Sequence, residues 1–122
     1  MNKKEAASKF LQLAATGKVD EAYHNFIAPN FIHHNQYFKG DRESLKIAMQ
    51  EAAKDNPENS ITVKHTFEDG DFVITFSEVK PNPQDVGIAV VHIFKFANQQ
   101  VVELWDLGQK ILEDAPNGNG IF

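Results

Sequence analysis

The sequence predicts an α+β fold, with helices gathered on one face of an antiparallel sheet. Apolar residues recur at helical spacing in the N-terminal half and alternate with polar residues downstream. Turn signals separate the alternating segments, as they do in hairpins. A chain of 122 residues is also the length of one compact domain. We therefore expect a single domain, with a helical part over 1–57, an antiparallel sheet over 58–110 and a tail over 111–122.

Three helices are expected in the helical part. The first carries an apolar stripe and ends at Gly17, a common helix stop. The second begins at Asp20, whose side chain can cap a helix, and it ends before Pro29. The third begins at Asp41 and ends ahead of Pro57. Each helix thus presents one apolar side that a sheet can cover.

The strands are expected after the helices. Residues 30–38 carry no helical period, so we interpret them as an ordered loop or a short extended piece. Turns at 68–71 and 98–99 define two hairpins, and two prolines within 81–85 mark a loop, because proline cannot donate to a sheet ladder. The expected strands are 61–67, 72–79, 86–96 and 100–107.

The last hairpin has apolar residues on both of its faces. With residues 98–99 as a two-residue turn, His92 lies opposite Trp105 and Val91 lies opposite Asp106. An antiparallel sheet normally has one face packed on the core and one face exposed to solvent. We therefore expect the helices to cover one face and a partner subunit, in a homodimer, to cover the other.

Composition excludes several classes of function. The net charge of −5 argues against nucleic-acid binding, and the absence of Cys excludes disulfide scaffolds and thiol nucleophiles. No run approaches the roughly 18 apolar residues of a membrane span, so we expect a soluble, cytoplasmic protein with no membrane contact. Thirteen aromatic residues, ten of them Phe, can serve a core, a cavity wall or an interface.

Three segments resemble those of a known family. Residues 31–35 (FIHHN) are similar to an aromatic-x-Gln-His-Asn segment, and residues 86–109 resemble a final hairpin that usually reads Glu-His-Trp-Asp. Residues 117–122 (NGNGIF) are similar to a terminal Asn-Gly-Met-Phe pattern. Over nearly the whole chain, the sequence resembles the SnoaL-like branch of the nuclear transport factor 2-like superfamily.

The resemblance implies a cone-shaped, curved antiparallel sheet wrapped around the helices, usually as a homodimer with an apolar cavity that takes a small hydrophobic molecule. The superfamily contains polyketide cyclases and ketosteroid isomerases as well as non-catalytic transport factors, so the fold does not settle the function. Two residues depart from the family pattern. Leu104 stands where His is usual, and His92 stands where an acidic residue is usual.

Asp106 is the first candidate catalytic residue. It follows an apolar strand, and burial there raises the pKa of a carboxyl, which suits a general base that removes a proton next to a carbonyl. A carboxylate at a strand end can instead bond backbone amides or face solvent. In the family alignment the catalytic Asp can also fall at Gln109, in which case this base is absent.

His34 and Asn35 are the next candidates. Adjacent residues in an extended segment point in opposite directions, so only one of His33 and His34 faces a cavity. The resemblance favours His34, as a proton shuttle or a carbonyl hydrogen-bond donor, with Asn35 stabilising an oxyanion. In the alternative reading Asn35 bonds its local turn and His33 is exposed.

The residues expected to contact the substrate are Asn35, His92, Trp105 and Gln109. His92 and Trp105 are cross-strand neighbours in the expected register, and their alternative place is the core or an interface. His65 lies in the apolar phase of its strand and is a weaker candidate, as is His24. The His residues have no metal-ligand spacing, and no phosphate loop or dinucleotide fingerprint is present, so we expect neither metal nor cofactor.

These features predict a cofactor-independent lyase or isomerase that acts on a small hydrophobic carbonyl compound. The alternative is a binding module of the same fold without chemistry. The tail is expected to fray unless Ile121 and Phe122 anchor it. We expect it to dock over the cavity mouth or a subunit groove and to help exclude water from Asp106.

Overall fold

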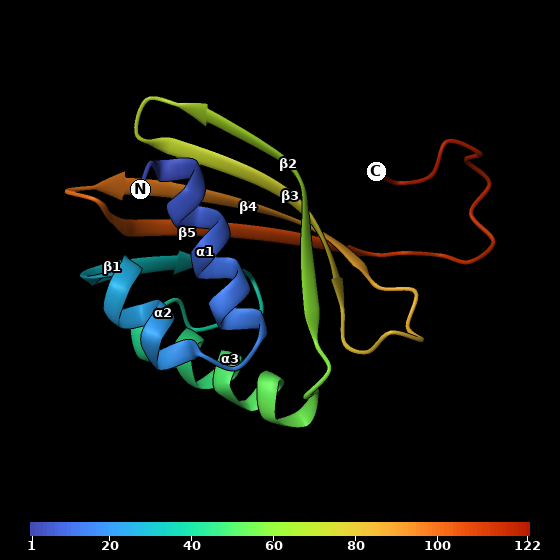
Figure 1. Cartoon of the computed structure of the whole chain (residues 1–122), viewed down its shortest axis with the longest axis horizontal. Helices are drawn as coiled ribbons and strands as arrows, with labels where there is room; N and C mark the ends of the chain where they lie inside the picture. Colours follow the sequence, from blue (N-terminus) through green and yellow to red (C-terminus); the bar gives the residue numbers. More distant parts are fainter.

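Helices and a five-stranded sheet make up the computed structural model, which describes all residues 1–122 (Figure 1). The helices are α1 (Lys3–Ala15), α2 (Val19–Phe26) and α3 (Arg42–Asp55). The strands are β1 (Ile27–His34), β2 (Ser60–Asp69), β3 (Phe72–Lys80), β4 (Ile88–Ala97) and β5 (Gln100–Lys110). The predicted α+β class is confirmed. None of the helices combines the length and apolar character needed to cross a membrane.

The helix starts follow local capping chemistry. Asn2 and Glu5 form a reciprocal capping box at α1. At α3, which begins beside Asp41 as expected, the Asp41 side chain accepts the backbone N–H of Ser44. The expected cap of α2 is wrong, because α2 begins at Val19 and Asp20 lies in its first turn. A carboxylate at that position still interacts favourably with the positive end of the helix dipole.

The strand order is β1-β5-β4-β3-β2, and β1 pairs with β5 in parallel while the other pairs are antiparallel. The sheet is therefore mixed, which corrects the expectation of a purely antiparallel sheet confined to 58–110. Residues 27–34 form a full strand within the expected helical part. The parallel partner lies about seventy residues further along the chain, so no local turn signal marks this strand.

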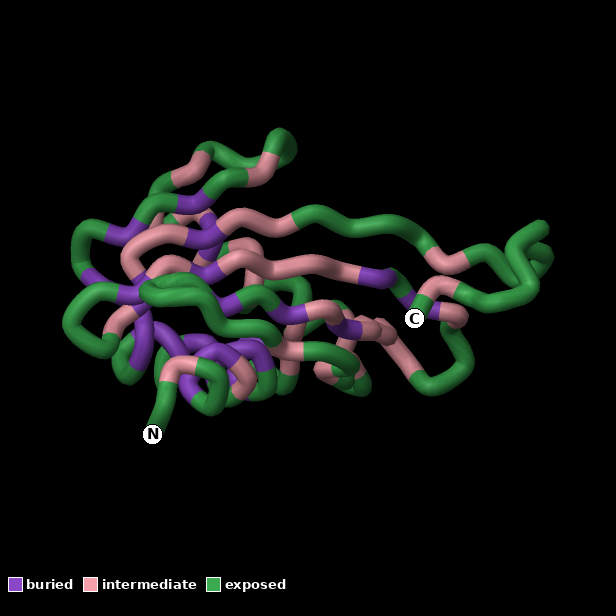
Figure 2. The backbone as a smooth tube through the Cα atoms, turned by 90° about the horizontal axis from the view of Figure 1, so that it is seen from above, coloured by how far each residue is buried: buried purple, intermediate pink, exposed green.

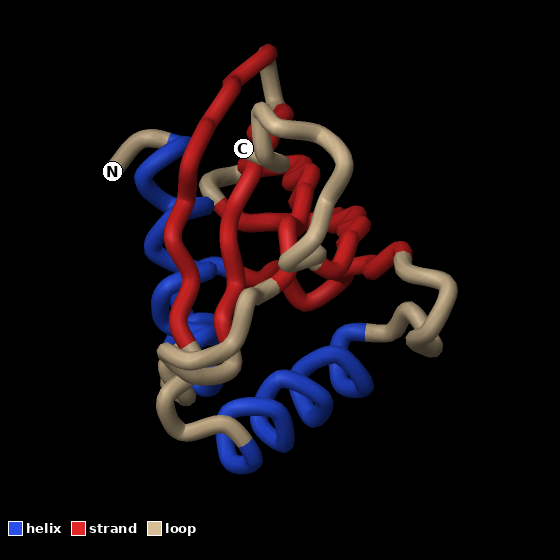
Figure 3. Tube along the Cα trace, turned by 90° about the vertical axis from the view of Figure 1, so that its right-hand side faces the viewer, coloured by secondary structure: helices blue, strands red, loops and turns tan.

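The helices all lie against one side of the sheet, which we call the inner face; the opposite side is the outer face (Figure 3). The buried core forms where α1 and α2 meet the inner face, and Figure 2 shows buried residues gathered in that half of the molecule. Phe10 of α1 packs edge-on against Phe94 of β4, with ring centroids 6.1 Å apart. Leu45 is the one buried residue of α3, whereas α1 and α2 each bury several, so α3 contributes less to the core.

A bulge in β5 changes the expected register of the last hairpin. The turn forms at Asn98 and Gln99, which both have positive φ, but the pairing shifts by one residue beyond it. His92 therefore pairs with Asp106 and not with Trp105. Because side chains alternate between faces, His92 and Asp106 share the inner face and Trp105 lies on the outer face. The predicted pairing of His92 with Trp105 and of Val91 with Asp106 is wrong.

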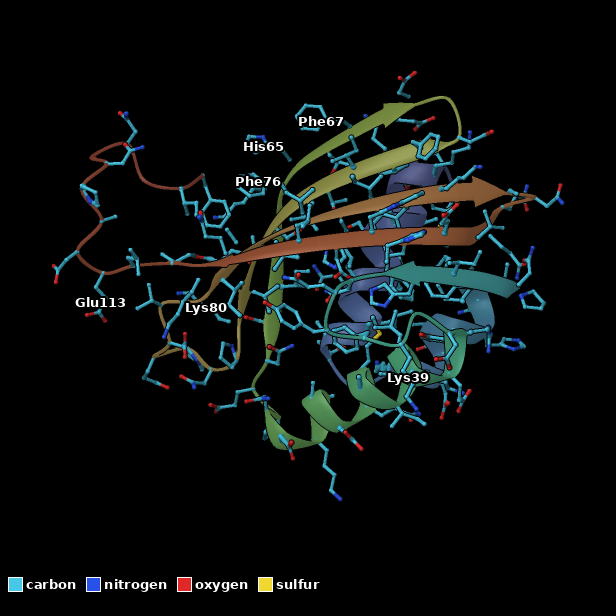
Figure 4. The ribbon with its side chains drawn as sticks, turned by 180° about the vertical axis from the view of Figure 1, so that it is seen from behind. Lys39, His65, Phe67, Phe76, Lys80 and Glu113 are labelled. Carbon is cyan, nitrogen blue, oxygen red and sulfur yellow. The ribbon has the colours of Figure 1, made fainter.

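A second bulge lies in β2. The pairing with β3 shifts between Val63 and His65, so His65 and Phe67 lie on the outer face with Phe76, as Figure 4 shows from behind. The His65 ring stacks on the Phe76 ring, with centroids 6.3 Å apart. The expectation that His65 continues the apolar phase of Val63 is therefore wrong.

The C-terminal tail is anchored through its last residue, but not over the cavity mouth; its docking in a subunit groove stays a prediction. The Phe122 ring contacts Phe76, with centroids 5.1 Å apart, and the Lys64 ammonium lies 5.3 Å from the Phe122 ring. Since Phe76 lies on the outer face, the tail does not cover Asp106, which lies on the inner face. The predicted role of the tail in excluding water from Asp106 is wrong.

Replacing Phe122 with Ala is expected to lower the free energy of unfolding by roughly 1 kcal/mol, because the side chain is 39% exposed and loses only part of a full burial term. Urea denaturation measures this. Leu112→Ala is the matched control, because Leu112 lies in the same tail and is more exposed, and it should change stability little. Equal losses in the two variants would show that Phe122 is no anchor.

Candidate functional site

A row of polar side chains crosses the inner face of the sheet. Thr75 of β3 pairs with His92 of β4, and His92 pairs with Asp106 of β5. His33 of β1 completes the row, with Nε2–H donating to Asp106 Oδ2 at 2.7 Å. The His33 side chain is wholly buried, whereas the Asp106 side chain keeps 15% of its exposure. The row therefore contains one carboxylate, that of Asp106, which solvent can still reach.

Asn35 holds the other carboxylate oxygen in place. Its Nδ2 donates to Asp106 Oδ1, and its own Oδ1 accepts the backbone N–H of Tyr37 at 2.9 Å. The turn closes where the backbone N–H of His33 donates to the carbonyl of Gly40. Gly40 has φ +93°, and a Cβ there would lie 3.0 Å from the His33 carbonyl oxygen, so this turn requires glycine. Asn35 is thus a positioning residue for Asp106.

The electrostatics of Asp106 differ from the expectation. Burial raises the pKa of this carboxyl. The hydrogen bonds from His33 and Asn35, and the charge interactions with His33 and His92, lower the pKa by more than burial raises it. The net result is a pKa below the ordinary value, so Asp106 is ionised at neutral pH. The predicted upward shift is wrong, because the donors come from β1 and its following turn.

His92 stays neutral at neutral pH. Burial lowers its pKa to about 4, although the nearby Asp106 carboxylate opposes this shift. A neutral imidazole can both donate and accept a hydrogen bond. His92 therefore offers a polar but uncharged contact on the inner face.

The two adjacent histidines point to opposite faces, as expected, but the inner one is His33. The His34 Nε2 lies 2.6 Å from Glu103 Oε2, and its ring stacks on Trp105 with centroids 4.8 Å apart. Both contacts are on the outer face. The expectation that His34, and not His33, lies on the inner face is corrected, because β1 places His33 beside Leu104 in the parallel ladder. His34 still borders the pocket at the ends of β1 and β5.

Two pockets flank the polar row. A pocket of about 440 Å³ lies at the ends of β1 and β5, and an apolar pocket of about 150 Å³ lies between α1, α3 and the inner face. The larger one is lined by His34, Asn35, Gln36, Tyr37, Trp105, Asp106, Leu107 and Gly108. His92 lines the apolar pocket. Gln109 lines neither and lies beside the tail.

Sequence reasoning missed His33, Thr75 and Ser77 as site residues. The spacing within β3 gave no signal for the last two, because Thr75 and Ser77 alternate with Ile74 and Phe76 as residues of a wet face do. Both hydroxyl side chains are nevertheless fully buried on the inner face.

Solved structures with this fold cover most of the chain. An NTF2-like protein of unknown function from Cytophaga hutchinsonii aligns with a TM-score of 0.73 at 14% identity, over 89% of this chain and 91% of its own. A cystatin-fold protein from Novosphingobium aromaticivorans aligns with a TM-score of 0.72 at 19% identity, over 88% and 98%. A candidate polyketide cyclase from Bacillus cereus aligns with a TM-score of 0.73 at 23% identity, over 85% and 72%. At these identities the likeness shows the fold alone.

The family is shown by a sequence model that matches residues 4–112 and describes SnoaL-like polyketide cyclases. No curated protein sequence matches the chain. The matched range includes both strands that carry the Asp106 and His33 pair. The chain therefore belongs to the SnoaL-like polyketide cyclase family.

Proposed function

We propose that the protein is a cofactor-independent lyase or isomerase that transfers a proton on a small hydrophobic carbonyl compound, with Asp106 as the proton acceptor. The observation that carries the proposal is the placement of this ionised carboxylate. His33 and Asn35 hold its two oxygens, a solvent-reachable pocket opens on it, and His92 beside it lines an apolar pocket.

The chemistry follows from this arrangement. A C–H bond next to the carbonyl breaks, its electron pair forms the enolate, and the proton passes to the Asp106 carboxylate. Neutral His92 stabilises the developing oxyanion as a hydrogen-bond donor. Return of the proton to another atom completes an isomerisation, whereas loss of a leaving group completes an elimination. An apolar substrate also displaces water, which raises the pKa of Asp106 toward that of a useful base.

A second candidate function is ligand binding without chemistry. Both Asp106 oxygens already accept hydrogen bonds, and the lowered pKa makes the carboxylate a weak base. Leu104, where the family usually has His, is buried in the core and offers no proton. A binding module would use the same apolar pocket between α1, α3 and the inner face.

Exchange of α-hydrogens with D₂O separates the two functions, because it needs proton abstraction and no knowledge of the final product. Cyclohexanone and small hydroxyketones are incubated with the protein, and exchange is followed by proton NMR. Replacing Asp106 with Asn is expected to slow the catalysed exchange at least about hundredfold while leaving ligand binding in place.

Glu103→Gln is the matched control. Glu103 also lies on β5 and also pairs with a histidine, but on the outer face, so exchange should be unchanged. Exchange that survives Asp106→Asn, or the absence of exchange with every bound compound, favours the binding module.

We also propose that the protein forms a homodimer through the outer face of the sheet. Large apolar side chains remain exposed there, namely Ile32, Phe67, Phe72, Ile74 and Leu107. Five strands about 4.8 Å apart and about ten residues long give this face an area of roughly 800 Å². That is about the area each partner buries in a stable interface of standard size.

Replacing Leu107 with Glu is expected to convert the dimer to a monomer at micromolar concentration, because a carboxylate would be buried in the contact without a partner. Light scattering measures the mass. Leu112→Glu places the same charge on the tail and should leave the dimer intact. A monomeric parent protein, or equal behaviour of both variants, would contradict the outer-face dimer.

A further inference from the structure

The tail contains the two Asn-Gly pairs of the chain. They are Asn117-Gly118 and Asn119-Gly120, and all four residues are exposed. In such a pair the backbone nitrogen of the glycine can attack the side-chain amide of the asparagine, because glycine has no Cβ to hinder the approach. Every other asparagine precedes a larger residue or a proline, whose nitrogen carries no hydrogen. The tail therefore holds the two asparagines at which this attack is least hindered.

The two asparagines differ in what contacts their side chains. Asn117 Oδ1 accepts the backbone N–H of Asn119 at 2.9 Å, whereas no hydrogen bond holds the Asn119 side chain. Attack on the amide carbon of Asn117 moves negative charge onto Oδ1. The Asn119 N–H already donates to that oxygen, so it stabilises the tetrahedral intermediate as the donors of an oxyanion hole do.

The two attacking nitrogens also differ. The Gly120 N–H donates to the Asn117 carbonyl oxygen at 3.4 Å, whereas the Gly118 N–H donates no hydrogen bond within the protein. A backbone nitrogen must lose its proton before it attacks, and a hydrogen bond to a carbonyl oxygen holds that proton in place. Both differences favour reaction at Asn117 over reaction at Asn119.

We propose that Asn117 is a site of spontaneous deamidation and that the turn of the tail makes it react faster than Asn119. The Gly118 nitrogen loses its proton to hydroxide and forms a bond to Asn117 Cγ. The bond from Cγ to Nδ2 then breaks, and Nδ2 takes up a proton from water and leaves as ammonia. A second water opens the resulting succinimide ring and gives aspartate or isoaspartate at position 117.

The product alters the lining of a pocket. Asn117 lines a pocket of about 480 Å³ between the tail and the end of β5, together with Ile111 and Ile121. Lys110 is the one charged residue of this lining, and deamidation adds a carboxylate to it in place of a neutral amide. The reaction is independent of the proposed function, because it needs no substrate and does not involve Asp106.

Incubation of the full chain at mildly alkaline pH tests the proposal. Peptide mapping by mass spectrometry, with isoaspartate analysis, follows deamidation at each asparagine over time. Asn117 is expected to react first and Asn119 more slowly, and the rate at Asn117 is expected to rise with hydroxide concentration. Asn56 and Asn82 precede proline, so they are internal controls that should stay intact.

Asn119→Pro and Asn119→Ala form a matched pair of variants. Both remove the second reactive asparagine, but only proline removes the N–H that donates to Asn117 Oδ1. Deamidation at Asn117 should be roughly fivefold slower in the proline variant, the factor expected for loss of one neutral hydrogen bond. Gly118→Ala should also slow it, because the new Cβ hinders the attack. Nothing lies within 4 Å of that Cβ, so the tail itself is not disturbed.

Three outcomes overturn the proposal: no deamidation at Asn117, a rate at Asn119 that equals or exceeds the rate at Asn117 in the parent protein, or equal rates at Asn117 in the two Asn119 variants. The readout is the mass of the tail peptide and not turnover. Failure of this inference therefore leaves the proposed function untouched.

Discussion

Replacing Phe94 with Ala is expected to lower the free energy of unfolding by about 3 to 5 kcal/mol, which is a large part of the stability of a domain of this size. Phe94 is fully buried at the centre of β4 and contacts the rings of Phe10, Phe96 and His92. Its neighbours on α1, β3 and β5 cannot all move into the space of a lost ring. Urea denaturation followed by circular dichroism measures the loss.

Phe67→Ala is the matched control. Phe67 is the same residue type in the same sheet, but it is 60% exposed on the outer face of one subunit. When both variants are made in the Leu107→Glu background, where the proposed dimer contact is removed, the loss of the Phe67 ring should cost less than about 1 kcal/mol. A cost for Phe94 as small as the cost for Phe67 would mean that the core is not packed around β4. Because Phe94 stacks near His92, the Phe94 variant should also weaken ligand binding in the apolar pocket.

The sequence predicted those parts of the fold that depend on neighbouring residues. Helical stripes, the Asp41 cap and the Asn98-Gln99 turn are local, and the structure has all of them. Strand β1 was predicted only as a loop or a short extended piece over 30–38, because its residues alternate poorly and its partner β5 is remote in the chain. The family resemblance predicted a curved sheet, and periodicity alone does not predict curvature.

The candidate site was predicted less completely, and the bulges explain why. One extra residue in β5 places Asp106 and Trp105 on the opposite faces of the sheet from those predicted. No residue type in that segment indicates a bulge. Asp106 was identified from its apolar surroundings, but the histidine expected to act with it on the substrate was His34 and not His33. That choice depends on which face of β1 meets the helices, which the parallel register decides.

Replacing His33 with Leu is expected to lower the free energy of unfolding by about 3 kcal/mol at pH 7, because it removes one partner of a buried pair. The Asp106 carboxylate would then keep only the hydrogen bond from Asn35, and burial would raise its pKa. The residual 15% exposure of Asp106 keeps this cost at the lower end of the range for buried pairs. His34→Leu is the matched control, since that pair is exposed on the outer face and should cost less than about 1 kcal/mol.

The pH dependence of this loss follows from the direction of the Asp106 pKa shift. A carboxyl whose folded pKa is below its unfolded value of about 3.9 adds stability above that value, and the added stability disappears as pH falls through the folded pKa. The parent protein should therefore lose stability as pH falls below about 5, and the His33→Leu variant should lose less over the same range. The gap between the two proteins is expected to narrow as pH falls from about 5 to 3, as measured by urea denaturation at each pH. A gap that stays constant with pH would mean that His33 stabilises the fold by packing alone, without its contact to the Asp106 carboxylate.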